Sequence, residues 1–428
     1  MKKILIASYY LPPCNMISAG RAQSFADNFH KHGLYPIIVT RHWQGDEIST
    51  EGYESENLAP PLVTEHEGYR LIQLPYRKQL NNPYQRAILN TTAGKRLLYT
   101  ALYASGTVNP KCNAYACFKD YLVSYLSTDP VDYILATGFP MNTIRLGAYL
   151  SNKFSKPFIA DFRDLWDNDL LSKTSVPSTV KRLQNFFYEH YLRRWLAPAR
   201  LITGVSQPIV DEAKRLAPHT KGMVVTNGFE AKLFADLRRN IPQRSDKFVF
   251  SVIGTLHPNQ NLSVMLYGLT LFLGNKDLDE IELNFIGTAT IAEVGELIAS
   301  KLPADCLHIT GRVPRSDALE VMLSSHVLFH AGWPGHSGIA SGKLYEYLGA
   351  HRNILIAPND HGVMEKIVTE TNAGKLADTA EEFASIMNDW FSEWTVKRML
   401  EYFGDDKKIA GYAREEQAKN LALEILKI

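Results

Sequence analysis

KILIAS, residues 3–8, decides the fold class of this 428-residue chain. It is a short, continuous apolar run, and the loop after it contains Pro12 and Pro13. Residues 22–31 then show apolar positions with a helical period, and residues 35–40 form a second continuous apolar run. Continuous apolar runs indicate strands that are buried on both faces, and intervening helices indicate a parallel sheet.

The same alternation continues along the chain in two sets. Further apolar runs of the first set lie at residues 133–136, 157–161, 201–205 and 223–227. A polar stretch at 238–246 precedes the second set, with runs at residues 248–253, 282–286, 307–310, 327–330 and 353–357. Helical stretches separate these runs, so the sequence predicts an α/β protein with two doubly wound domains.

Composition excludes several classes of protein. Lys and Arg total 46 and Asp and Glu total 45, and a net charge of +1 argues against a dedicated nucleic-acid binder. No apolar run reaches the length of a membrane span, and the short run at residues 4–7 lacks a signal-peptide cleavage site. No Cys or His spacing matches a zinc site, so no metal is predicted. The cysteines are scattered along the sequence, as is typical of a protein in a reducing cytosol. They are Cys14, Cys112, Cys117 and Cys306.

Three common active-site motifs are absent. The first glycine after the first strand is Gly20, so there is no G-x-G-x-x-G at that turn. The chain also contains no P-loop and no G-x-S-x-G nucleophile elbow. Classical NAD binding, P-loop phosphoryl transfer and hydrolase chemistry of the elbow type are therefore not predicted.

The informative motif is HSGIASGKLYEYLGA, residues 336–350, in which a glycine-rich loop enters a helix. Amide groups at a helix N-terminus can hold a phosphate, and Lys343 in the first turn adds a positive charge. One turn later, Glu346 could accept hydrogen bonds from the two hydroxyls of a ribose. The local pattern equally allows Glu346 to be a surface residue that pairs with Lys343.

This motif resembles the nucleotide-binding motif of family 4 glycosyltransferases with the GT-B fold. Other similar segments follow in the family's order, namely residues 4–8 with 12–13 and 19–21, FIADFRDLW at 158–166, residues 203–206 with 225–229, and residues 252–255. The resemblance implies two Rossmann-like domains that face each other across a cleft. It places residues 1–230 with 400–428 in the N-terminal, acceptor-side domain and 231–399 in the C-terminal, nucleotide-sugar domain.

The resemblance also implies a reaction: retaining, metal-independent transfer of a sugar from a UDP- or GDP-linked donor, without a cofactor. The acceptor would be a glycan or a lipid-linked molecule of cell-surface polysaccharide or glycolipid synthesis, at the cytoplasmic side. The expected catalytic residues are Asp161, Arg163, Asp164 and Lys343. The expected donor-binding residues are Gly20, Arg21, Gly254, Thr255, Gly311, Arg312, Val313, Gly338, Ser341, Gly342, Lys343, Leu344 and Glu346.

Simpler roles remain open for several of these residues. The pattern from Asp161 to Asp164 also fits an ion-pair network that ties loops together, and Arg21 also fits a solvated residue at a helix start. His330, His336 and Trp333 flank the glycine-rich loop and are either structural or part of the site.

The chain departs from the family pattern at two places. Gly338 stands where the family has the first Glu of its E-x7-E element, and residues 255–261 lack the Arg and Lys that commonly bind the diphosphate. Two other functions therefore stay open. One is a sugar-nucleotide epimerase with the GT-B fold, and the other is a non-catalytic nucleotide-binding subunit.

Charge is distributed unevenly along the N-terminal half. Residues 68–119 contain no Asp or Glu, and their basic residues are interleaved with aromatic residues. A similar basic and aromatic patch covers residues 181–200. This combination is typical of surfaces that bind anionic membranes, so the protein is predicted to be peripheral on the inner face of the membrane. Alternatively, the aromatic residues form the core of a helical subdomain whose basic residues are solvated.

Overall fold

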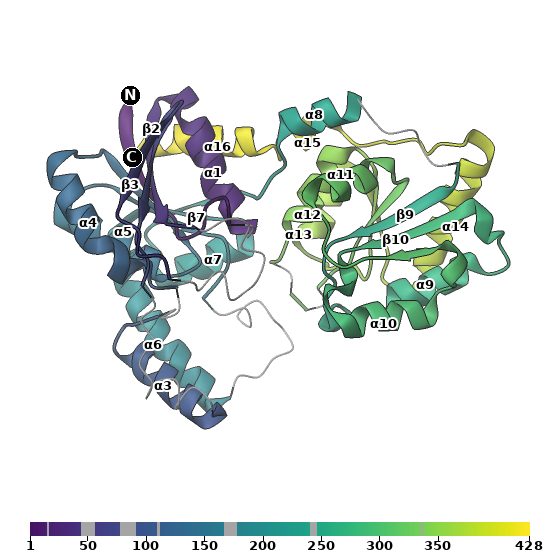
Figure 1. Ribbon diagram of the computed structural model, residues 1–428, viewed down its shortest axis with the longest axis horizontal. Helices are drawn as coiled ribbons and strands as arrows, with labels where there is room; N and C mark the ends of the chain where they lie inside the picture. Colours follow the sequence, from purple (N-terminus) through teal and green to yellow (C-terminus); the bar gives the residue numbers. More distant parts are fainter. Residues whose placement is uncertain are drawn as a thin grey trace. The chain divides into compact units, whose positions relative to one another are not determined.

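The computed structural model describes residues 1–14, 17–43, 56–77, 91–108, 112–166, 178–239, 246–333, 335–336 and 338–428 (Figure 1). The chain divides into two compact units, of which the first is Met1–Thr226 with Glu415–Ile428 and the second is Asn227–Arg414. The C-terminal segment of the first unit therefore begins at Glu415, whereas the sequence placed it at residue 400.

The first unit is built on a sheet in the order β3-β4-β2-β1-β5-β6-β7-β8. All neighbours pair in parallel except β3 and β4, which are antiparallel. The six strands of the predicted runs are β1 (Lys2–Ala7), β2 (Leu34–Arg41), β5 (Tyr133–Gly138), β6 (Phe158–Phe162), β7 (Ala199–Gly204) and β8 (Lys221–Val224). The edge strand β3 (Leu62–His66) and its neighbour β4 (Tyr69–Leu74) were not predicted.

Strand β1 shows why the apolar runs are continuous. Ile4 and Ile6 belong to one core, which includes residues of α1 (Ile17–Phe29) and α16 (Arg414–Ile425). Leu5 and Ala7 belong to a second core, which includes residues of α4 (Ala114–Thr128) and α5 (Asn142–Phe154). Alternate side chains thus enter cores on opposite faces of the sheet, and both faces require apolar residues.

Three more helices complete the described part of the first unit: α3 (Thr92–Ala104), α6 (Thr179–Leu196) and α7 (Gln207–Leu216). Helices α3 and α6 lie side by side and extend away from the sheet (Figure 1). The buried residues of α6 are all in its C-terminal half, and none of the residues of α3 is fully buried.

The second unit has a parallel sheet in the order β11-β10-β9-β12-β13-β14. Its strands are β9 (Phe248–Ile253), β10 (Ile281–Ile286), β11 (Leu307–Ile309), β12 (Val327–His330), β13 (Asn353–Ile356) and β14 (Gly374–Leu376). Its α-helices are α8 (Ala231–Arg239), α9 (Ser263–Leu273), α10 (Ala292–Lys301), α11 (Arg315–Ser324), α12 (Gly342–Ala350), α13 (Val363–Thr371), α14 (Ala380–Lys397) and α15 (Asp406–Ala410). Helices α9 and α14 contribute to one core, whereas α11, α12 and α13 contribute to another.

The second sheet has the strand order 3-2-1-4-5-6 of a Rossmann-like domain, and the parallel strands of the first sheet have the same order with β8 added as a seventh strand at the edge. The predicted α/β fold class with two doubly wound domains is therefore confirmed. Strand β14 was not predicted, because its residues Gly374, Lys375 and Leu376 do not form an apolar run. Among the described residues, no helix has the length and hydropathy needed to cross a membrane.

Candidate functional site

The candidate site lies at the carboxyl edge of the second sheet, where β9 and β12 are parallel neighbours. In this strand order, a crevice forms between the carboxyl ends of strands one and four. Gly254 follows β9, Ala331 follows β12, and the glycine-rich loop leads from β12 into α12. The sequence prediction of a loop that enters a helix at residue 342 is confirmed.

Helix α12 is fixed to the two strands by Tyr347. Its hydroxyl accepts a hydrogen bond from the Ile253 amide at 3.1 Å and donates one to the Phe329 carbonyl at 3.2 Å. Leu344 is fully buried in the apolar core under the helix. The side chain of Leu344 therefore packs in the core, and the expected donor contact of this residue stays a prediction.

The first residue before α12, Ser341, does not cap the helix with its side chain. Its hydroxyl lies 2.5 Å from Nε2 of His330 instead. The other ring nitrogen of His330 lies 2.9 Å from the Ala331 carbonyl, to which it can only donate, so Nε2 accepts the Ser341 proton. The amide groups of the first turn of a helix have no partner within the helix. The N-terminus of α12 is therefore left without its usual side-chain acceptor.

Lys343 reaches from the first turn of α12 to the end of β9. Its Nζ donates a hydrogen bond to the Thr255 carbonyl at 3.2 Å. Burial lowers the pKa of Lys343 to about 8, against the opposing effect of the Glu346 carboxylate. The carboxyl edge of the second sheet thus brings together the N-terminus of α12 and the poorly solvated ammonium of Lys343. The residues that meet there are Gly254, Thr255, Ser341, Gly342 and Lys343.

Glu346 pairs with Arg315 rather than with Lys343. The Arg315 NH2 lies 3.1 Å from Oε1 of Glu346 and 3.0 Å from Oε1 of Glu230. Glu230 in turn accepts a hydrogen bond from Arg414 at 3.1 Å. Glu346 is therefore neither the partner of Lys343 nor an isolated surface residue, because an arginine holds one of its oxygens.

The predicted base-binding loop follows β11, on the same edge of the sheet. Gly311 and Arg312 are exposed, and Val313 packs partly against the core. Gly338 lies in the turn before α12. Each of these positions keeps its expected role as a prediction.

An aromatic cluster lies beside the site, and it includes His257, which was not predicted, together with the sequence candidates Trp333 and His336. The ring of Trp333 lies 5.6 Å from that of His257 and 6.3 Å from that of His336. Burial lowers the pKa of His257, and the charge of Lys343 lowers it further. The positions of these residues in the sequence could have indicated the cluster, because His257 follows β9 and Trp333 follows β12.

In the first unit, Arg21 and Asp161 form a buried ion pair. Nε of Arg21 lies 2.9 Å and NH2 lies 2.6 Å from the two carboxylate oxygens of Asp161. NH1 of Arg21 donates to the carbonyls of Val225 and Thr226, and Asp161 is fully buried. This geometry fits the ion-pair network left open for Asp161, and it excludes a solvated Arg21. The expected catalytic role of Asp161 and the donor contact of Arg21 stay predictions. Gly20 lies beside Arg21 in α1.

The segment after β6 presents two unsatisfied donors. Arg163 pairs with Asp164 at 2.5 Å through NH2, but its buried NH1 has no partner among the described residues. The buried indole nitrogen of Trp166 also lacks a partner there. Buried donors without acceptors are costly, so the segment is suited to a ligand that supplies oxygen atoms. Arg163 and Asp164 were predicted as site residues from the sequence, whereas Trp166 was not.

The basic window at residues 68–119 separates into two parts. In one part the side chains serve the fold, since Arg70 pairs with Glu65 at 2.5 Å and with Asp129 at 2.8 Å, and Tyr76 and Phe118 are fully buried. The other part is α3, whose residues are largely exposed. Lys78, Tyr84, Arg86 and Lys111 of this window lie outside the described residues.

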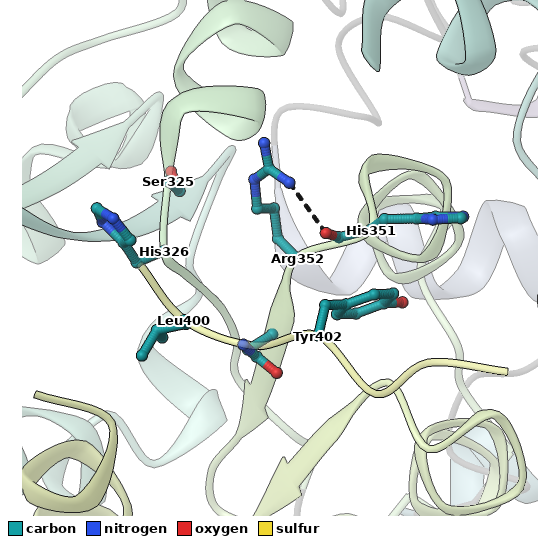
Figure 2. Close-up of a pocket in the computed structure, with 7 residues that line it drawn as sticks. Ser325, His326, His351, Arg352, Leu400 and Tyr402 are labelled. Carbon is teal, nitrogen blue, oxygen red and sulfur yellow. Dashed lines mark hydrogen bonds between the residues drawn. The ribbon is translucent and has the colours of Figure 1, made fainter. Parts of the chain in front are cut away.

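A pocket in the second unit lies at the opposite edge of the sheet (Figure 2). It is lined by Ser325, His326, His351, Arg352, Asn353, Leu400 and Tyr402. Ser325 and His326 precede β12 and Arg352 precedes β13, so the pocket borders the amino ends of these strands. The guanidinium of Arg352 donates hydrogen bonds to the carbonyls of Leu323 and His351. The pocket is therefore separate from the candidate site.

Within the described ranges, no group of His, Cys, Asp or Glu side chains could hold a metal ion.

Solved structures share this architecture over the whole chain. Sucrose-phosphate synthase from Thermosynechococcus elongatus is 15% identical, with a TM-score of 0.65, and the match covers 100% of this chain and 99% of that chain. Trehalose 6-phosphate synthase from Burkholderia multivorans is 11% identical with a TM-score of 0.57, covering 99% and 95%. Anabaena HepE, solved with UDP and glucose, is 13% identical with a TM-score of 0.52 and the same coverage. The chain has the GT-B fold. No family model and no curated protein matches the sequence.

Proposed function

We propose that the protein is a glycosyltransferase that moves a sugar from a nucleotide-diphosphate sugar to an acceptor hydroxyl. The observation that carries the proposal is the anion site at α12, where Ser341 is turned to His330 and Lys343 lies at the end of β9. Anabaena HepE, which shares the fold, was solved with UDP and glucose. A UDP- or GDP-linked donor therefore suits the fold and the charge of the site.

The proposed donor contacts follow from the geometry of the second unit. The amides of Gly342 and Lys343 and the Lys343 ammonium would hold the diphosphate, because helix N-termini and cations favour phosphate oxygens. Glu346, whose Oε1 is held by Arg315, would offer its other oxygen to the ribose hydroxyls. The backbone of residues 311–313 would contact the base.

The chemistry needs negative charge to be stabilised on the leaving diphosphate while the bond between the sugar C1 and the phosphate oxygen breaks. Preorganised amides and a poorly solvated cation supply this stabilisation without reorganisation. Lys343 replaces the Arg and Lys that are absent from residues 255–261. The retaining course and the independence from metal are part of this proposal, as the family resemblance implies.

The acceptor side is assigned to the first unit. The buried, unpaired donors of Arg163 and Trp166 would bind oxygen atoms of a glycan or lipid-linked acceptor. Asp164, whose carboxylate is about half-exposed, is the candidate for accepting the hydroxyl proton. Synthesis of a cell-surface polysaccharide or glycolipid on the cytoplasmic side is the proposed setting.

A thermal-shift panel of UDP, GDP, ADP, CMP and their sugars tests the donor site. We expect one diphosphate to stabilise the wild type and Glu346→Ala to abolish the shift. Glu296→Ala, an exposed residue on α10, is the matched control. If no nucleotide stabilises the wild-type protein, the proposed function is wrong.

Turnover of the donor that binds separates transfer from the two other functions. Consumption of the donor that depends on an acceptor extract supports transfer. Epimerised donor formed without an acceptor would identify an epimerase, and binding without any turnover would identify a nucleotide-binding subunit.

A further inference from the structure

Helices α3 and α6 run in the same direction. Gln184 on α6 donates a hydrogen bond to the hydroxyl of Thr100 on α3 at 2.9 Å. Further along both helices, the Tyr191 hydroxyl donates to the Ala104 carbonyl at 2.8 Å. The residue numbers of the bonded partners increase together along α3 and α6. Both helices therefore begin at the same end of the pair. We call residues 91–97 and 178–186, at this end, the tip.

The tip exposes large apolar side chains. Leu97 on α3 is 73% exposed and Phe186 on α6 is 65% exposed. Val180 and Leu183 on α6 are exposed as well. Four such residues at the end of one helix pair form a larger apolar surface than isolated exposed residues do, and such surfaces mark sites of interaction.

The same tip is basic and free of acidic residues among those described. Lys95 and Arg96 lie near the start of α3, and Lys181 and Arg182 lie in the first turn of α6. Neither helix has an acidic residue in its first turn. The one acidic residue within the two helices is Glu189, which lies beyond the tip and pairs with Arg215 at 2.5 Å.

This arrangement is unfavourable for the isolated helices. The N-terminus of a helix carries partial positive charge, so acidic residues stabilise it and basic residues destabilise it. Two helix N-termini and four basic side chains concentrate positive charge at one tip. An anionic partner would relieve this repulsion.

We propose that the tip docks on an anionic lipid bilayer. Apolar side chains flanked by basic ones match the layered chemistry of a membrane surface, with acyl chains below and phosphates at the interface. The inference goes beyond the proposed function, since it involves no residue of the donor or acceptor site. It gives a membrane partner to a transferase whose acceptor is lipid-linked.

Sedimentation of the full-length protein with vesicles tests the charge component. The vesicles are pure phosphatidylcholine, or phosphatidylcholine with an equal amount of phosphatidylglycerol. We expect binding to the anionic vesicles only, and weaker binding at roughly 0.5 M salt, where screening is strong. Each basic residue near such a surface contributes about fivefold in affinity, so the double variant should bind at least roughly 25-fold more weakly. The variant is Lys95→Glu with Arg182→Glu, and its control is Lys407→Glu with Lys408→Glu on α15.

A second pair of variants tests the apolar component. Leu97→Ser with Phe186→Ser should weaken binding to anionic vesicles at both salt concentrations. Tyr267→Ser with Leu271→Ser, exposed on α9, should bind as the wild type does. The four residues substituted by serine are exposed, so these variants should fold. Thermal unfolding of every variant checks that the fold is intact.

Three outcomes would overturn the proposal. The first is equal binding to neutral and anionic vesicles, and the second is wild-type binding by both tip variants. The third is an oligomer of the wild type in the absence of lipid that the tip variants dissociate, which would make the tip a contact between copies of this chain. The thermal-shift panel with nucleotides is unaffected by any of these results, so the two proposals fail separately.

Discussion

A β-carbon on Gly254 would overlap the Nζ of Lys343. Gly254 also has a φ of +89°, which disfavours every residue with a β-carbon. The turn after β9 thus leaves the space that the Lys343 ammonium occupies. The position of the Lys343 ammonium therefore depends on the absence of a side chain 89 residues earlier.

Gly254→Ala is expected to displace Lys343 and to weaken nucleoside-diphosphate binding by at least about tenfold, because a cation moves away from the phosphates. Gly274→Ala is the control, since Gly274 also has a positive φ but no close side chain. Both variants should lose about 1–2 kcal/mol of stability from backbone strain. Calorimetric titration with the stabilising nucleotide checks this, and equal affinities of the two variants would contradict it.

Lys343→Met is expected to stabilise the ligand-free protein while abolishing nucleotide binding. The pKa of Lys343 is lowered by burial to about 8 from 10.5, so at pH 7 the fold bears the cost of a poorly solvated charge. Removing the charge should stabilise the fold by up to about 3 kcal/mol. Urea unfolding at pH 7 measures this change. A variant that is both less stable and unable to bind would show that Lys343 serves the fold.

The same group predicts a pH dependence of the wild type. Between pH 8 and 10.5 the unfolded chain binds a proton at Lys343 that the folded chain does not, so the free energy of unfolding rises with pH in this window. Nucleotide affinity should fall over the same window, because the ammonium is lost. Lys343→Met should show neither trend.

Arg315→Ala is expected to weaken nucleotide binding severalfold with little effect on stability. Arg315 holds Oε1 of Glu346, but it is half-exposed, and exposed ion pairs contribute at most about 1 kcal/mol. Arg398→Ala, which removes a similarly exposed pair with Glu280, is the control. A 2′-deoxy nucleotide should bind wild type and Arg315→Ala with equal affinity if Glu346 contacts the ribose.

The strands that carry the site could be predicted because each is buried on both faces and is therefore continuously apolar. Strands β3 and β4 could not, because β3 is largely exposed and its residues Thr64, Glu65 and His66 are polar. Their residues lie in or next to a stretch whose charge pattern suggested a surface.

The loop that enters α12 at the candidate site was predictable, but its side-chain partners were not. His330 and Ser341 are 11 residues apart, and Arg315 and Glu346 are 31 apart. Neither pair lies within a single helix or strand. The first pair depends on the connection from β12 to α12, and the second depends on the packing of α11 against α12. The bidentate pair of Arg21 and Asp161 joins residues even further apart.

His330 predicts a loss of stability in acid. Burial, with the charge of Lys343, lowers the pKa of His330 to about 4 from 6.5, so between these values only the unfolded chain binds the proton. The free energy of unfolding should therefore fall by about 2 kcal/mol between pH 7 and pH 5 from this group. Burial lowers the pKa of His351 to about 4 as well. In urea titrations at both pH values, His330→Asn and His351→Asn should each reduce the pH dependence, and the double variant should reduce it most.

The last prediction separates the two arginines of the first unit. Arg21→Met leaves Asp161 charged and fully buried, and loss of one partner of a buried pair costs about 3–5 kcal/mol. Arg163→Met removes a donor that has no acceptor and an ion pair with the half-exposed Asp164, so its stability should stay within about 1 kcal/mol of the wild type. Arg163→Met should instead reduce acceptor-dependent turnover while nucleotide affinity stays unchanged. Chemical denaturation together with the turnover assay checks both variants. Comparable losses of stability would show that Arg163, like Arg21, holds the fold rather than a substrate.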